Sequence, residues 1–233
     1  MILMRDKAPK KDYDKQSRYP KHRFTLYFML FYEAFWRIIG ANLMFILFCL
    51  PVVTIPAAIG GLTRVMSRLA RDEQVYVIDD FIQGFKEEWK KSTIFGLITI
   101  LFFALAYLAI GVYSKLIDNS IISTILLALV FTVILVFLAC ANYVWVMIVS
   151  VDLPLKQIIK NALALCLVKP FGTLITLVVQ GAVIFVALGY FPVGLFLPLI
   201  FGFSIMSFTG SFNAWPQIEK YVINPHNKTK EGD

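Results

Sequence analysis

Residues 119–151 decide the fold class, because they read NSIISTILLALVFTVILVFLACANYVWVMIVSV and contain no charged side chain. About 20 apolar residues in a helix span the hydrocarbon core of a bilayer, and this run is longer than that. Three more uncharged runs occupy residues 38–63, 92–114 and 170–218. The last of them has room for two crossings. The sequence therefore predicts an all-α, polytopic membrane protein built as a helical bundle.

The composition of the whole chain agrees with this class. Of 233 residues, 59% are hydrophobic and 16% are charged, whereas soluble domains carry about 25% charged residues. The net charge is +7. Excess Lys and Arg in a membrane protein gather on cytoplasmic loops beside anionic lipid, and no zinc-ligand pattern or recognition helix accompanies them here. The charge therefore indicates membrane lipids as partners and argues against nucleic acid.

Six transmembrane helices are expected from the positions of the uncharged runs. The expected spans are 38–53, 57–69, 92–114, 119–151, 171–190 and 193–215.

Amphipathic segments are expected beside these spans. Aromatic residues recur every three to four positions in 24–36, which predicts an interfacial helix leading into the first span. Within it Glu33 and Arg37 are four residues apart and can pair on one helical face. Apolar residues at helical spacing also predict two amphipathic cytoplasmic helices, at 77–91 and 155–167.

The segment 57–69 decides between six spans and five, because it is short and contains Arg64 and Arg68. Eight basic residues lie in 1–23, six in 64–91 and three in 152–169. If 57–69 crosses the membrane, all of them lie on one side, as the positive-inside rule requires. If it does not cross, the eight basic residues of the first segment lie outside. Six spans with both termini cytoplasmic are therefore preferred, and five are the alternative.

This topology divides the chain into three parts. Residues 1–23 form a basic cytoplasmic tail, 24–221 a single transmembrane helical domain, and 222–233 a polar C-terminal tail.

An arginine stripe next to the second expected span is a candidate for contact with a partner or with lipid. Arg64, Arg68 and Arg71 follow one another at spacings of four and three, which places them on one helical face. Asp72 and Glu73 come directly after them. Snorkelling of the arginines to the phosphate layer is the simpler interpretation. The sharper hypothesis is that the stripe docks the acidic surface of a partner or a lipid headgroup.

The helix expected at 77–91 provides the second candidate contact. Phe81, Phe85 and Trp89 lie on one of its faces and Lys86 on the other. Such a stripe is typical of a helix that lies in the membrane interface or seats in the groove of a partner. Packing against its own bundle is the commoner role of an apolar stripe.

Enzyme chemistry is not indicated by any motif in the sequence. There is no GxSxG, HExxH or Walker A motif. The three cysteines are widely spaced without a CxxC pair, and the two histidines lie near opposite ends of the chain. We therefore expect no catalytic residues, no cofactor and no metal site. The polar residues inside or near the spans are Asn42, Asn142, Gln180 and Asn213, and such side chains usually form hydrogen bonds between helices.

Three sequence motifs carry a resemblance to a known family. They are CLPVVTI at residues 49–55, RDE at 71–73 and DFIQGFK at 80–86. Together they resemble the YesL-like family of small bacterial membrane proteins, a domain of unknown function. The resemblance covers about residues 28–93 in motifs and extends to the C-terminus in hydropathy alone. Arg64 departs from it, because the family has an aromatic or apolar residue there.

The resemblance implies a location and a role. It implies the bacterial cytoplasmic (plasma) membrane. Members are often encoded beside sugar-importing ABC transporters, which implies a non-enzymatic accessory or scaffold subunit that contacts the permease subunits of a carbohydrate ABC importer. The alternative is an independent small-solute carrier or channel, followed by a membrane enzyme acting on a lipid or a lipid-linked sugar. The oligomeric state is not indicated.

Overall fold

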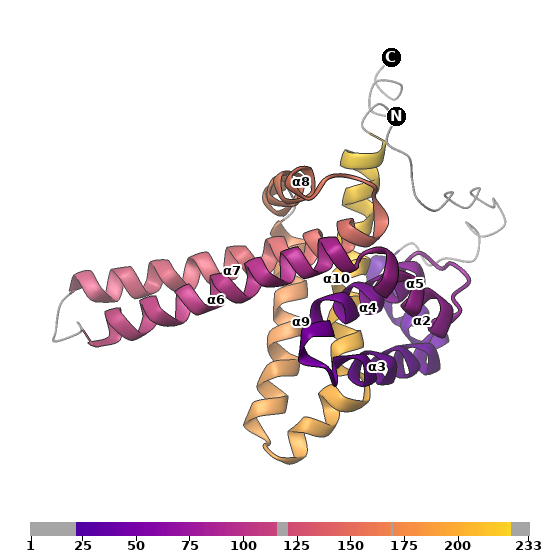
Figure 1. The fold of residues 1–233 in the computed structure, drawn as a ribbon, viewed down its shortest axis with the longest axis horizontal. Coiled ribbons are helices and arrows are strands. Elements are labelled where there is room, and N and C mark those ends of the chain that lie inside the picture. The colour runs from indigo at the N-terminus through magenta and orange to yellow at the C-terminus, as the bar shows by residue number, and fades with distance from the viewer. Residues whose placement is uncertain (1–21, 116–120, 169, 225–233) are drawn as a thin grey trace.

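The computed structural model describes residues 22–115, 121–168 and 170–224, and all regular elements in these ranges are helices (Figure 1). The all-α prediction is confirmed. The predicted tail at 1–23 lies outside the described ranges except for its last two residues. Of the tail predicted at 222–233, only 222–224 are described.

The first two helices form a bent pair. Helix α2 (Arg23–Glu33) is followed by α3 (Phe35–Cys49), and the chain bends by 69° between them at Ala34. This geometry suits an interfacial helix that turns into a crossing, as the aromatic pattern predicts. The bend also separates Glu33 from Arg37, so the predicted pairing of these residues on one continuous helix does not apply.

A proline-rich turn connects α3 to the next helix. Pro51 precedes a 3₁₀ turn at Val52–Thr54, and α4 (Ile55–Ala70) follows with Pro56 in its first turn. Proline is tolerated there because the first amides of a helix have no partner within the helix. The segment from Pro51 to Pro56 is therefore a tight reversal between two short helices.

The remaining helices are longer. Helix α5 (Val77–Glu87) is separated from α6 (Trp89–Lys115) by the single residue Glu88. The amphipathic helix predicted at 77–91 is therefore shorter than expected, and Trp89 begins the next helix. Then come α7 (Ile121–Ser150), α8 (Leu155–Val168) and α9 (Pro170–Gly189). A 3₁₀ turn at Val193–Leu195 and a π turn at Pro198–Gly202 lead into α10 (Phe203–Ile218), which ends in a second π turn at Glu219–Ile223.

The described part of the chain has four helices long and apolar enough to cross a membrane, or five if the bent α2–α3 pair is one span. The four are Trp89–Ser114, Ile121–Ser150, Pro170–Gly189 and Val193–Ile223. A multi-pass membrane protein is therefore supported, but six spans are not confirmed. The expected spans that are not confirmed correspond to α3 and α4, whose 15 and 16 residues cover about 22 and 24 Å, less than the roughly 30 Å of bilayer hydrocarbon. Helix α3 counts as a span only together with α2.

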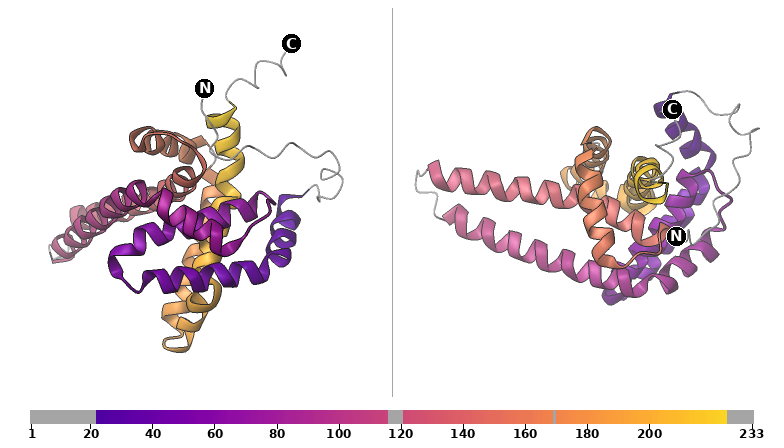
Figure 2. Two further views of the ribbon diagram at one scale, coloured as in Figure 1. Left: turned by 45° about the vertical axis from the view of Figure 1, so that its right-hand side comes forward. Right: turned by 90° about the horizontal axis from the view of Figure 1, so that it is seen from above.

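The helices form a compact body with one projecting arm (Figures 1 and 2). Helices α6 and α7 make the arm, and the α9–α10 hairpin runs crosswise to it in both views. One buried cluster joins α7, α8, the end of α10 and Phe95 of α6. A second joins α2, α3 and α4 to Phe81 of α5 and to Phe208 and Phe212 of α10. The arm exposes large apolar side chains along most of its length, as expected of helices that face lipid.

Candidate functional site

Helices α4 and α5 approach each other closely because glycines lie at their contact. A Cβ atom on Gly61 would lie 2.8 Å from the carbonyl oxygen of Phe81. One on Gly84 would lie 2.9 Å from both Cβ and Cδ of Arg64. Neither position has room for a side chain, so the two backbones pack directly, as small residues allow in membrane helices.

Charged residues connect these two helices from the start of α5 to its end. We call this set the α4–α5 charged cluster. Its members are Arg64, Arg68, Arg71, Glu73, Asp80 and Glu87.

Arg64 is the deepest member of the cluster. Its side chain is only 2% exposed, and its Nη1 lies 3.3 Å from Oε2 of Glu87. The aliphatic part of Arg64 packs on Gly84. A charge this buried needs a partner, because desolvation costs several kcal/mol per ion. Glu87 of α5 therefore makes the burial of Arg64 in α4 possible.

Arg68 links α4 to the start of α5. Its Nε donates to Oε2 of Glu73 at 3.0 Å, and its Nη1 donates to Oδ1 of Asp80. The other carboxylate oxygen of Asp80 accepts the backbone N–H of Tyr76, the N-cap residue of α5, at 2.9 Å. Asp80 thus satisfies one of the open amides at the helix start and ties that start to α4.

The RDE triplet ends α4 in a defined way. Asp72 adopts a left-handed backbone with φ 54°, and its N–H bonds the carbonyl of Leu69 at 3.0 Å. The N–H of Glu73 bonds the carbonyl of Arg68 at 3.1 Å. These two bonds form a Schellman motif, in which glycine usually takes the left-handed position.

The same triplet connects α4 to α10. Nε of Arg71 donates to the carbonyl of Ser67 at 3.1 Å and lies 3.3 Å from Oε1 of Glu73. The Arg71 guanidinium also lies over the ring of Trp215, 4.3 Å from its centroid. The triplet therefore holds three segments together: α4, the loop before α5, and α10.

The predicted arginine stripe is thus engaged within the chain. Snorkelling predicts arginines that reach the phosphate layer, whereas all three have carboxylates of this protein beside them. The physical reason is that α5 folds onto the arginine face of α4, and spacing within one helix does not show which helix covers it. Contact of these residues with a partner or lipid stays a prediction.

The aromatic stripe predicted on α5 divides between two environments. Phe81 is fully buried and Phe85 half-buried, and their ring centroids lie 5.2 and 5.1 Å from that of Phe48 in α3. Trp89 is exposed, as is Lys86. Packing within the bundle therefore explains two of the three aromatics, and Trp89 is left on the surface.

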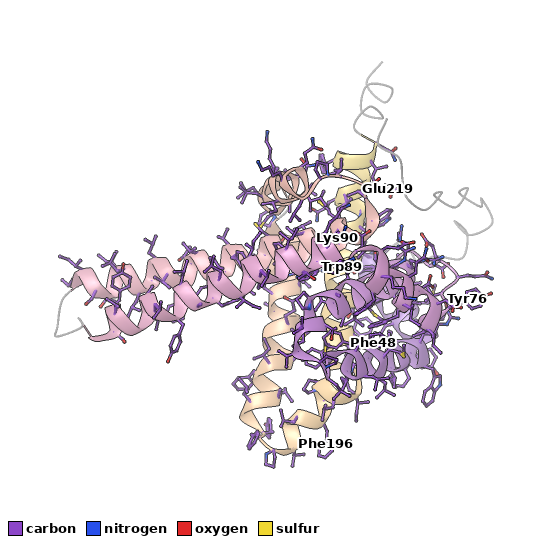
Figure 3. The ribbon with its side chains drawn as sticks, in the orientation of Figure 1. Phe48, Tyr76, Trp89, Lys90, Phe196 and Glu219 are labelled. Atoms are coloured by element: carbon purple, nitrogen blue, oxygen red, sulfur yellow. The ribbon has the colours of Figure 1, made fainter. Side chains whose placement is uncertain are left out.

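Exposed side chains beside α5 make a surface that we call the outer edge. It is defined by Tyr76, Ile78, Lys86, Trp89 and Lys90. Figure 3 labels Tyr76 before α5, and Trp89 and Lys90 after it. Tyr76 precedes α5, Ile78 and Lys86 lie on it, and Trp89 and Lys90 begin α6. The outer edge therefore combines large apolar groups with two cations, and the other side of α5 is fixed by the charged cluster.

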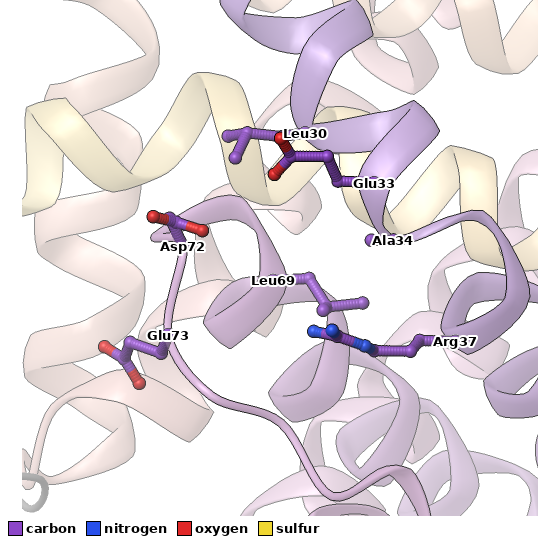
Figure 4. Close-up of a pocket in the computed structure, with 7 residues that line it drawn as sticks. All are labelled: Leu30, Glu33, Ala34, Arg37, Leu69, Asp72 and Glu73. Atoms are coloured by element: carbon purple, nitrogen blue, oxygen red, sulfur yellow. The ribbon is translucent and has the colours of Figure 1, made fainter. Parts of the chain in front are cut away.

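A small cleft lies between the α2–α3 bend and the end of α4 (Figure 4). It encloses about 70 Å³, room for a few water molecules. Its lining residues are Leu30, Glu33, Ala34, Arg37, Leu69, Asp72 and Glu73. Within the described ranges no group of three or more His, Cys, Asp or Glu side chains is arranged to hold a metal ion. The sequence does not predict this cleft, because the cleft depends on the bend at Ala34 and no proline or glycine marks the position of that bend.

The polar residues predicted between helices do form interhelical hydrogen bonds. Asn42 donates to the carbonyls of Pro198 and Leu199 at 3.0 and 2.8 Å and accepts the N–H of Ser204 at 3.0 Å. It thereby satisfies backbone groups around the π turn before α10.

The other three predicted amides bond within α7, α9 and α10. Asn142 and Gln180 exchange two bonds, at 3.3 and 2.6 Å, and Asn213 donates to Thr176 at 2.8 Å. Because these amides bond side chains of neighbouring helices, the carrier or channel alternative gains no support from them.

Comparison with known proteins gives one match. Residues 38–110, about a third of the chain, match the family model described as "Protein of unknown function, DUF624". The matched segment runs from α3 into α6 and contains the α4–α5 charged cluster. It is consistent with the resemblance to the YesL-like family. No curated protein and no solved structure matches the chain.

Proposed function

We propose that this chain is a non-enzymatic accessory or scaffold subunit of a bacterial cytoplasmic membrane, which docks a partner through the outer edge of α5. The observation that carries the proposal is that this edge is exposed while the opposite side of α5 is ion-paired to α4. The partner we propose is the permease part of a carbohydrate ABC importer. That identity rests on the family resemblance alone.

The chemistry of the outer edge suits a protein partner. Tyr76, Ile78 and Trp89 are 70%, 60% and 51% exposed. Exposed Trp and Tyr are enriched among residues that dominate interface energies. A helix already fixed in place loses less entropy on binding than a mobile one. The charged cluster therefore supplies the rigidity that such a docking surface requires.

Cross-linking in native membranes followed by mass spectrometry tests the docking proposal. An amine-reactive reagent should join Lys86 or Lys90 to a permease subunit, and Trp89→Ala should reduce that product severalfold. Tyr107→Ala is the matched control, because it removes an exposed aromatic from the α6 arm. Cross-links at Lys86 and Lys90 that stay within the chain, or a product unaffected by Trp89→Ala, would refute the proposal.

We also propose that the membrane topology has six spans, with α4 crossing and both termini cytoplasmic. Support comes from the neutralised charges of Arg64 and Arg68, which remove the main cost of placing this short helix in the bundle.

Cysteine accessibility tests this topology. Val53 and Gln74 flank α4 and are both exposed. Single cysteines are introduced there in a background in which Cys49, Cys140 and Cys166 are all replaced by alanine, and the cells are treated intact with a membrane-impermeant maleimide. Val53→Cys should react and Gln74→Cys should react only after lysis. Equal labelling of both positions from one side would contradict six spans.

A further inference from the structure

Helix α8 connects two candidate membrane spans and is therefore held at a membrane surface at both ends. Helix α7 ends at Ser150, only a few residues before α8 begins at Leu155. Helix α9 begins at Pro170, directly after α8 ends at Val168. A chain that leaves a bilayer through α7 and re-enters it through α9 has both junctions on one face, so α8 cannot lie far from that face.

The direction of α8 agrees with this position. In Figure 1 α8 is seen nearly end-on, whereas α7 and α9 run across the view. The view from above in Figure 2 shows α8 running across α7 as well. Because α8 is crosswise to both neighbours, it lies along the plane of a bilayer crossed by either of them.

The two sides of α8 differ in their environment. Ile158, Ala162 and Leu165 are buried against the protein. The opposite side exposes Leu163 and Leu167, which are 50% and 73% accessible.

The exposed side is also basic. Lys156 and Lys160 are exposed in the first half of the helix, and residues 155–168 contain no acidic residue. An exposed side that is apolar and purely cationic is complementary to an anionic lipid surface.

We propose that α8 is a membrane-surface anchor, lying in the headgroup layer of the leaflet where α7 ends and α9 begins. Lys156 and Lys160 bind the phosphates of anionic lipids, and Leu163 and Leu167 enter the boundary of the acyl chains. The long lysine side chains allow this, since their ammonium groups reach the headgroups while their methylenes stay against apolar surface. This surface is separate from the outer edge of α5, so the two proposals can fail independently.

Photo-cross-linking in native membranes tests the position of α8. A benzophenone amino acid replaces Leu163 in one variant and Gln157 in another. Gln157 is also exposed but lies toward the other side of the helix, so it is the matched control. Lipid adducts, identified by mass, should form at residue 163 and be at least severalfold rarer at 157. Protein adducts at residue 163, or equal lipid adducts at both positions, would overturn the proposal.

Lipid preference tests the role of the two lysines. The full chain is placed in nanodiscs that mix phosphatidylcholine with phosphatidylglycerol, and the lipids retained after detergent extraction are counted by mass. The enrichment of phosphatidylglycerol should fall about fivefold for each lysine replaced in Lys156→Gln and Lys160→Gln. Arginine at both positions should preserve the enrichment. An unchanged enrichment in the double Gln variant would overturn the assignment of anionic lipid.

Discussion

The close contact between α4 and α5 makes Gly61→Ala the most informative single substitution. The new methyl group would lie 2.8 Å from the carbonyl oxygen of Phe81 and 3.2 Å from its ring. A backbone oxygen cannot move aside alone, so α5 must shift away from α4. Overpacking of this kind costs about 1–3 kcal/mol, and alanine returns up to about 1 kcal/mol through its higher helix propensity.

The two effects leave a net loss between about 0 and 3 kcal/mol, and the middle of that range, about 1–2 kcal/mol, is the loss expected for Gly61→Ala. For a chain of this size that lowers the melting temperature by about 2–8 °C. Thermal unfolding in mild detergent, followed by tryptophan fluorescence, measures the change.

A matched control separates packing from propensity. Gly111 lies in α6 with no atom within 4 Å of its added Cβ. Gly111→Ala should leave the melting temperature unchanged or raise it slightly. If Gly61→Ala has the same melting temperature as Gly111→Ala, the backbones of α4 and α5 do not pack directly at Gly61.

Three more substitutions test other contacts by the same unfolding measurement. Glu87→Gln should destabilise the protein by about 1–3 kcal/mol, because it removes the carboxylate that pairs with the buried Arg64 guanidinium. Asp79→Asn, at an exposed position, should have little effect, and equal losses for the two variants would refute the stabilising role of the Arg64–Glu87 pair. Asp72→Val should cost about 1–2 kcal/mol, since a β-branched residue is poorly suited to φ 54°, while Asp72→Asn should be tolerated. If Asp72→Val leaves the stability unchanged, residue 72 does not adopt the left-handed conformation. Asn42→Leu should cost about 2–3 kcal/mol, because it leaves backbone groups of residues 198, 199 and 204 without hydrogen-bond partners. Leu43→Ala, at an exposed position, is the control, and an equal or smaller loss for Asn42→Leu would contradict the hydrogen bonds of Asn42 to the segment before α10.

Much of the architecture follows from uncharged run length alone. The predicted spans at 92–114, 119–151 and 171–190 correspond closely to α6, α7 and α9. Length and hydropathy suffice here because the bilayer imposes one requirement on every crossing. The interhelical bonds of Asn42 and Asn142 were likewise foreseeable, since a buried amide in an apolar segment must find a partner.

The charged cluster was not foreseeable, although each of its residues could be singled out. Spacing places Arg64, Arg68 and Arg71 on one face but does not reveal that α5 covers it. Counting charges by membrane side treats an arginine paired to Glu87 and an arginine facing lipid as equal. The sequence pattern also does not show that Phe81 is buried while Trp89 is exposed, because it does not reveal that the helix is interrupted at Glu88 and that Trp89 begins a new one.

The aromatic pattern predicts a turn from an interfacial helix into the first span, but the position of the bend at Ala34 escaped prediction because no helix-breaking residue marks it. The residues on either side, Glu33 and Phe35, continue an unbroken helical pattern. Only tertiary packing decides the direction of α3, and with it the cleft that Glu33 and Arg37 line together.

The order of residues in the charged cluster has a consequence for synthesis. The arginines of α4 leave the ribosome before their counter-charges, because Asp80 follows Arg68 by 12 residues and Glu87 follows Arg64 by 23. At about 5–20 residues per second, the second interval lasts roughly one to five seconds. During that time α4 carries two cations without their carboxylates from α5. The nascent chain therefore cannot settle α4 in its final place until the helix that follows it has been translated.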